Sequence, residues 1–123
     1  MITVHAKALL GNPLEVCSCK PLTGFFRDGF CKQFAIDTGK HTVCAIMTDE
    51  FLHFSKEQGN DLSSARLEYD FPGLREGDKL CVCVMRWIEA KINDKAPPVI
   101  LEACNESILK FVSLLELKKY TYQ

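Results

Sequence analysis

The sequence predicts a single α+β domain, a two-layer α/β sandwich with a small sheet, about three helices and long structured loops. Two short apolar runs, residues 42–47 and 79–85, have the composition of buried strands. Helix-capping residues occur at Thr48, Asn105 and Ser113, and the resulting irregular alternation of strands and helices favours α+β over a doubly wound sheet. At 123 residues the chain has the usual size of one domain, so residues 1–123 are treated as one unit.

Residues 79–85 form the central strand of this prediction, because their continuous apolar character is typical of a strand buried on both faces. Residues 86–90 either extend that strand or begin a helix. Residues 99–103, which follow Pro97 and Pro98, are predicted to form a further strand. Pro98 is compatible with this strand only at its start.

Three helices are predicted from their capping residues. The first begins at Thr48, which precedes two acidic residues, and ends at Gly59. The second follows Asn105 and runs through Phe111. The third begins at Ser113, which has the capping-box spacing to a glutamate, and ends near residues 118–119.

Two long segments are predicted to be structured loops. Turn-forming pairs interrupt residues 11–40 every few positions. Five large apolar side chains in this segment favour packing onto the body of the domain: Leu22, Phe25, Phe26, Phe30 and Phe34. Residues 60–77 form the second loop. Asn60 and Asp61 in this loop, and Asp78 directly after it, are expected to bind their own backbone.

Charge and composition exclude several classes of partner. The chain is 47% apolar and 25% charged with a net charge of −1. It contains no run of Lys or Arg residues that could bind phosphates. The first residues lack the pattern of a signal peptide, and the longest apolar run is too short to span a bilayer. We expect a soluble cytoplasmic monomer or small homo-oligomer that binds neither nucleic acid nor membrane, with a small molecule as its expected partner.

Seven cysteines are the most unusual feature of the composition: Cys17, Cys19, Cys31, Cys44, Cys81, Cys83 and Cys104. Their odd number and the absence of a signal favour reduced thiols over disulfides. Cys81 and Cys83 share one strand face, where they are interpreted as small buried hydrophobes. No metal is favoured, because CxxC pairs are absent; a bound metal would draw its ligands from Cys17, Cys31, Cys44, Cys81, Cys83 and His41.

Candidate catalytic residues gather around the long loop. Cys31 is the best thiol candidate, because it lies in a glycine-flanked loop beside charged residues where solvent is expected to reach it. Arg27, Asp28 and His41 complete the candidate set, although Arg27 and Asp28 could instead pair or cap a turn. His41 and Cys44 lie three apart, so pairing them on a strand requires a bend.

Arg86 and Glu89 flank the only tryptophan, where they could line a pocket or form an ion pair, and the ion pair is favoured. Phosphate-binding glycine loops, nucleophile elbows and zinc-protease helices are absent from the sequence.

Dispersed motifs resemble a bacterial and plastid family known only as domain of unknown function 2237. The motifs are Leu14-Glu15-x-Cys17, Thr23-Gly24-Phe25-x-Arg27-Asp28-Gly29-x-Cys31, His41-x-x-Cys44-Ala45-x-Met47-Thr48, Phe51-Leu52-x-Phe54-Ser55, Gly59-Asn60-Asp61-Leu62, Phe71-Pro72-Gly73-Leu74-x-x-Gly77-Asp78, Cys81-x-Cys83, Arg86-Trp87-x-Glu89-Ala90 and Ala96-Pro97-Pro98. The resemblance implies an α/β two-layer sandwich and supplies no reaction. The chain departs from the family pattern at Ala65 and Leu67, where prolines are usual, and at Cys19 and Cys104.

The leading hypothesis is a ligand-binding or thiol-chemistry site, built where the loop from Cys17 to Cys44 packs over the Cys81-x-Cys83 strand. The alternatives are a structural zinc module and a metal-free interaction module with inert buried cysteines. The sequence leaves the cofactor, and whether the protein is an enzyme, undefined.

Overall fold

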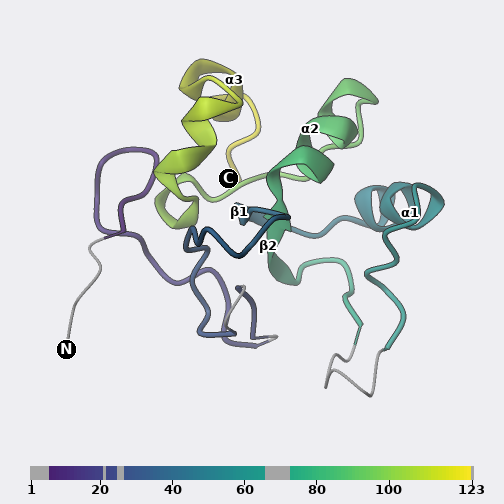
Figure 1. The fold of residues 1–123 in the computed structure, drawn as a ribbon. Coiled ribbons are helices and arrows are strands. Elements are labelled where there is room, and N and C mark those ends of the chain that lie inside the picture. The colour runs from purple at the N-terminus through teal and green to yellow at the C-terminus, as the bar shows by residue number, and fades with distance from the viewer. Residues whose placement is uncertain (1–5, 21, 25–26, 66–72, 123) are drawn as a thin grey trace.

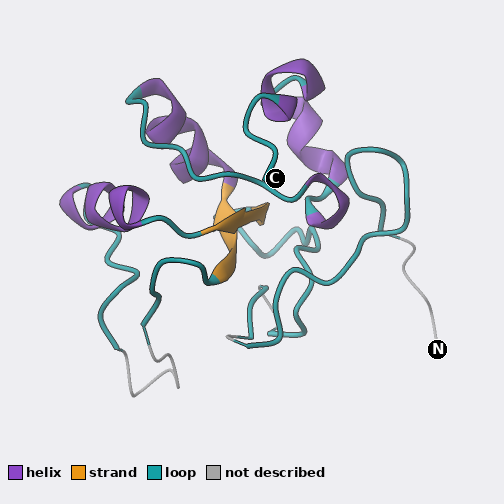
Figure 2. Cartoon of the chain, turned by 180° about the vertical axis from the view of Figure 1, so that it is seen from behind, coloured by secondary structure: helices purple, strands orange, loops and turns teal. Residues whose placement is uncertain are grey.

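The computed structural model describes residues 6–20, 22–24, 27–65 and 73–122. Its elements are β1 (His41–Ile46), α1 (Asp49–Glu57), β2 (Lys79–Cys83), α2 (Val84–Ile92), the 3-10 helices η2 (Leu101–Ala103) and η3 (Glu106–Lys110), and α3 (Leu114–Lys118). Figure 1 shows the three α-helices above and beside the two-stranded sheet, with long loops below it, and Figure 2 shows the same arrangement from behind. The prediction of an α+β fold with a small sheet and about three helices is confirmed. No helix in the described ranges is long and apolar enough to cross a membrane.

β1 and β2 form an antiparallel pair whose register brings two cysteines face to face. Cys44 lies directly opposite Cys81. The backbone N–H of Cys81 donates to Thr23 Oγ1 at 2.9 Å, and the carbonyl of Cys44 accepts from Ile100 N at 3.0 Å, so neither group bonds across this pair. In such non-hydrogen-bonded pairs the opposing side chains are closest together.

The strand predicted for residues 79–85 is two residues shorter than expected. β2 ends at Cys83, and α2 begins at Val84. Val84, Trp87 and Ala90 are all 0% exposed. Their spacing of three residues puts them on one buried face of a helix, whereas residues three apart on a strand would lie on opposite faces. The helical alternative for residues 86–90 is therefore confirmed.

The prediction that residues 99–103 form a strand is wrong for most of this range. Val99 makes single bridges to β1 and to the C-terminal segment, with Pro98 O accepting from Ile46 N at 2.9 Å. The chain then turns into η2 over Leu101–Ala103. Because Val99 N already donates to Tyr120 O at 2.8 Å, the segment extends the sheet for one residue only.

The predicted helix starts are confirmed by their capping contacts. Thr48 Oγ1 accepts from Phe51 N at 3.1 Å, and Ser113 Oγ accepts from Glu116 N at 3.2 Å. The Glu116 carboxylate contacts Lys119 at 2.8 Å and Lys91 at 3.0 Å. Hydrogen bonds from these two lysines hold the pKa of Glu116 below its usual value, and the Lys91 contact joins α3 to α2.

The predicted second helix, after Asn105, is the 3-10 helix η3, with Asn105 Oδ1 accepting from Ser107 N at 2.9 Å.

Trp87 is the largest side chain in the core and joins three parts of the chain. Its Nε1 donates to Pro97 O at 3.1 Å, and its ring meets Tyr120 edge to face with centroids 5.1 Å apart. On the outer side of α2, Arg86 and Glu89 lie 3.3 Å apart. The predicted ion pair beside the tryptophan is therefore confirmed.

Asp61 and Asp78 have the structural role expected of them in their turns. Asp61 Oδ1 accepts from the backbone N–H groups of Ser63 at 3.1 Å and Ser64 at 3.2 Å. Hydrogen bonds from Ser64, the side chain foremost, lower the pKa of Asp61 to about 2. Asp78 Oδ2 accepts from Arg75 N at 2.9 Å in the next turn.

Buried polar groups and sulfurs, more than large apolar anchors, hold the described part of the 11–40 loop against the sheet. Leu22 is 48% exposed, so the prediction that it packs onto the body is wrong; Phe30 and Phe34 are half-buried, while Phe25 and Phe26 lie outside the described residues. The side chains buried in the described part of this loop are those of Leu14, Cys17, Ser18, Thr23, Cys31 and Asp37.

We expect the Thr23 hydroxyl to be a main anchor of the loop, because it is 1% exposed and accepts from the backbone of β2. Thr23→Val keeps the shape but leaves the Cys81 N–H without its acceptor, which should cost about 1–3 kcal/mol of unfolding free energy. Thr23→Ser keeps the acceptor and should cost less, about 1 kcal/mol for one buried methyl. Urea unfolding without reductant measures both; a valine variant as stable as the serine variant would contradict this role.

Candidate functional site

Two disulfides lie together at the centre of the fold. Cys17 is bonded to Cys44 and Cys31 to Cys81, with Cα–Cα distances of 5.7 and 5.3 Å. The prediction of reduced thiols is wrong for these four residues in this structure. The expectation that solvent reaches Cys31 is also wrong, because Cys31 is 0% exposed. The predicted packing of the loop over the Cys81-x-Cys83 strand did not indicate that Cys31 itself would be buried against β2.

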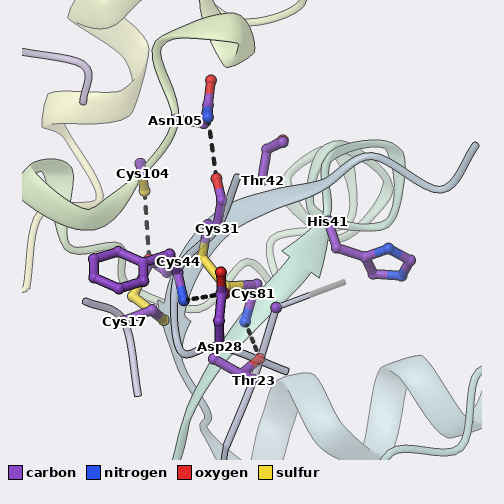
Figure 3. Close-up of a disulfide and its surroundings, with 12 residues drawn as sticks. Cys17, Thr23, Asp28, Cys31, His41, Thr42, Cys44, Cys81, Cys104 and Asn105 are labelled. Carbon is purple, nitrogen blue, oxygen red and sulfur yellow. Dashed lines mark hydrogen bonds between the residues drawn. A yellow bond between two sulfur atoms is a disulfide. The ribbon is translucent and has the colours of Figure 1, made fainter. Parts of the chain in front are cut away.

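These bonds join the long loop to the sheet. Cys17 and Cys31 come from the loop, and Cys44 and Cys81 come from facing positions on β1 and β2 (Figure 3). The Sγ atoms of Cys17, Cys31 and Cys81 all lie within 4.8 Å of one another. We call Cys17, Cys31, Cys44 and Cys81 the sulfur cluster; each of its members is at most 3% exposed.

The three remaining cysteines are free and differ sharply in exposure. Cys19 is exposed, Cys83 is half-buried and Cys104 is buried. Cys104 Sγ donates to Cys44 O at 3.5 Å, and burial raises the pKa of its thiol to about 12. The interpretation as a small buried hydrophobe is therefore wrong for Cys81, which is bonded, and for Cys83, which solvent reaches.

Asp37 and His41 form a pair at the start of β1. Asp37 is 1% exposed, and its two carboxylate oxygens lie 2.9 Å from His41 N and 2.8 Å from His41 Nδ1. The ring also packs on Gly39, where a Cβ atom would lie 2.6 Å from His41 Cε1. The imidazole is thus held in one orientation, and Nε2 has no hydrogen-bond partner among the described residues.

Cys83 lies opposite His41 in the strand pair, one pair beyond a bulge at Thr42. It is also the N-cap residue of α2, where its sulfur makes no capping hydrogen bond. Sequence spacing instead suggested Cys44 as the partner of His41, and Cys44 is bonded to Cys17. The bulge at Thr42 does not bring His41 to Cys44; it places His41 opposite Cys83 in the register of the strands.

Arg27 and Asp28 form a turn and do not join His41. Arg27, at φ 56°, donates from Nη1 to Gly24 O at 3.1 Å. Asp28 accepts from Phe30 N at 3.1 Å and contacts Lys32 at 2.8 Å. Burial raises the pKa of Asp28, but hydrogen bonds from Lys32 and from the Phe30 N–H outweigh it and hold the pKa below its usual value.

The four candidate catalytic residues are consequently not assembled into one site. Cys31 is bonded inside the sulfur cluster, Arg27 and Asp28 cap their own turn, and the His41 ring points away from the labelled disulfide sulfurs in Figure 3. The structure groups His41 instead with Asp37 and Cys83.

We expect Cys104 to be unreactive in the folded protein. A thiol whose pKa is about 12 has a thiolate fraction near pH 8 that is about a thousandfold below that of an ordinary cysteine. Alkylation with iodoacetamide, followed by peptide mass mapping, should modify Cys104 only after denaturation. Labelling of Cys104 at the rate of the exposed Cys19 under native conditions would contradict its burial.

Comparison with known proteins places the chain in a family. A search of curated proteins finds no match. The family model described as uncharacterized protein conserved in bacteria (DUF2237) matches residues 7–121, which span nearly the whole chain and all the motifs set out above. The chain therefore belongs to this family of uncharacterized bacterial proteins, domain of unknown function 2237.

Proposed function

We propose that this protein carries a reactive thiol, Cys83, which attacks small electrophilic molecules with the help of His41 and Asp37. The observation that carries the proposal is the register of the sheet, which sets Cys83 opposite an imidazole that a buried carboxylate already holds. Directly opposed residues of an antiparallel pair have Cβ atoms about 4.5–5.5 Å apart, within the reach of a thiol and an imidazole.

Each residue has a distinct role in this chemistry. Cys83 is the nucleophile, and its S–H proton passes to Nε2 of His41, since Nδ1 faces Asp37. The sulfur forms a bond to the electrophilic carbon while the bond from that carbon to its leaving group breaks and the leaving group takes the electron pair. Asp37 is a positioning residue that fixes the imidazole and stabilises its protonated form.

The position of Cys83 at the start of a helix favours this reactivity. α2 has nine residues, and Cys83 takes the N-cap position, where side chains usually accept from the free backbone N–H groups. Cysteines at helix N-termini or beside histidine are more reactive because the thiolate is stabilised there. Cys83 combines both settings and is partly accessible to solvent.

The proposal keeps the predicted thiol-chemistry site but moves its nucleophile. The hypothesis that the loop from Cys17 to Cys44 builds the site over the Cys81-x-Cys83 strand is retained, because Asp37 and His41 belong to the end of that loop and the start of β1. We place the protein in the cytoplasm, where free thiols persist, with a small molecule as its partner.

We expect Cys83 to be alkylated at least about tenfold faster than Cys19, because a neighbouring base and helix N-terminus promote thiol attack. Cys19 is an internal standard in the same chain, since it is free and exposed. His41→Asn should reduce the Cys83 rate to that of Cys19 and leave Cys19 unchanged. His53→Asn is the matched control, because His53 is 79% exposed on α1.

Time-resolved labelling with iodoacetamide and peptide mass mapping would measure both rates in each variant. Equal rates for Cys83 and Cys19 in the wild-type protein would overturn the proposal and favour an interaction module with inert thiols.

Asp37→Asn should slow Cys83 labelling without removing it. The asparagine keeps an oxygen that can accept from His41 N, but it loses the charge that stabilises a protonated imidazole. We expect a rate between those of wild type and His41→Asn, together with a loss of about 1–3 kcal/mol in unfolding free energy. Asp28→Asn is the control for removing a carboxylate from the same loop, and its Cys83 rate should equal the wild-type rate.

A further inference from the structure

The sulfur cluster holds its two disulfides closer to each other than cross-linking requires. A disulfide needs each sulfur to meet one partner, yet the Sγ atoms of Cys17, Cys31 and Cys81 lie within 4.8 Å of one another across both bonds. Cys44, the fourth member, is bonded to Cys17 and faces Cys81 across the sheet. Three sulfurs therefore lie close together, and the fourth is bonded to one of them.

We propose that, once its disulfides are reduced, the sulfur cluster binds one Zn²⁺ ion through four thiolates. A tetrahedral zinc site has Zn–S bonds of about 2.3 Å, which places its sulfurs about 3.8 Å apart. The Cys17 sulfur already lies within 4.8 Å of the Cys31 and Cys81 sulfurs. After reduction, the two sulfurs of each former disulfide must move apart to reach this spacing, which rotation of their side chains allows.

The burial of the ligands makes this a structural metal site. All four cysteines are at most 3% exposed, so no coordination position is left for water, as in closed tetrathiolate zinc sites. Thiolate ligands in a tetrahedral S4 set select zinc or iron–sulfur centres. Cys44 joins the ligand set because it is bonded to Cys17, whereas neither His41 nor Cys83 is within the close group of sulfurs or bonded to a member of it.

Replacement of the two disulfides by a metal ion requires a reductant and releases protons. Each disulfide takes two electrons and two protons from a dithiol reductant, which is oxidised to its own disulfide, and two thiols result. The four thiols then lose four protons as the zinc ion binds. One ion would thus replace both covalent links between the loop and the sheet, so the same fold would persist in oxidising and reducing surroundings.

The test uses the full chain, reduced anaerobically with a water-soluble phosphine, which supplies no thiol ligand. The phosphine becomes its oxide as water provides the protons. After zinc is added and excess removed, native mass spectrometry should find one zinc ion per reduced chain and none in the oxidised chain. Cobalt, added in place of zinc, should give the absorption spectrum of a tetrahedral thiolate site.

Variants separate this site from the reactive thiol proposed above. Cys17→Ser and Cys81→Ser should lose stoichiometric metal, whereas Cys19→Ser and Cys83→Ser should keep it. The cobalt spectrum of the reduced wild-type chain tests the metal site without any substitution, so its result does not depend on whether a variant of the sulfur cluster folds. A reduced wild-type chain that binds no zinc, or binds cobalt without a tetrahedral thiolate spectrum, overturns the metal site whatever the Cys83 labelling rate is.

Discussion

The facing pair of Cys44 and Cys81 is the constraint on which the rest of the structure depends. A two-stranded sheet is marginally stable by itself, and the described residues before His41 contribute only isolated bridges, without a helix or a longer strand, to pack on it. Because the pair makes no backbone bonds between its strands, its side chains come close enough to gather two disulfides on one face. In the chain-entropy account, separations of 27 and 50 residues correspond to about 3.5–4 kcal/mol each.

Local rules predicted the helices well, because their starts depend on neighbouring residues. Thr48 and Ser113 cap the helices that their side chains predicted. The strand boundaries depended on distant partners instead. Met85 belongs to an apolar run, yet it is 56% exposed on α2, since burial of Trp87 required the chain to become helical. Val99 lies beside β1 for one residue only, because Tyr120 occupies its other side.

The candidate site could be predicted in its residue types and only partly in its assembly. His41 and the Cys81-x-Cys83 strand were both singled out from the sequence. The partner of His41 was not, because it depends on a bulge at Thr42 and on the register between strands that are more than thirty residues apart in sequence. The glycine and charged neighbours of Cys31 predicted that solvent would reach this residue. In the folded chain the loop instead brings Cys31 to Cys81, to which it is bonded.

The two disulfides also overlap along the chain, since Cys31 lies between Cys17 and Cys44, and Cys44 lies between Cys31 and Cys81. One or the other bond therefore spans every peptide bond from residue 17 to residue 81. A protease that cuts once between Cys17 and Cys81 leaves both pieces covalently joined, with the helices and the sheet still tied to the N-terminal segment. Only reduction would release a fragment, so this protein can carry a nicked backbone without coming apart.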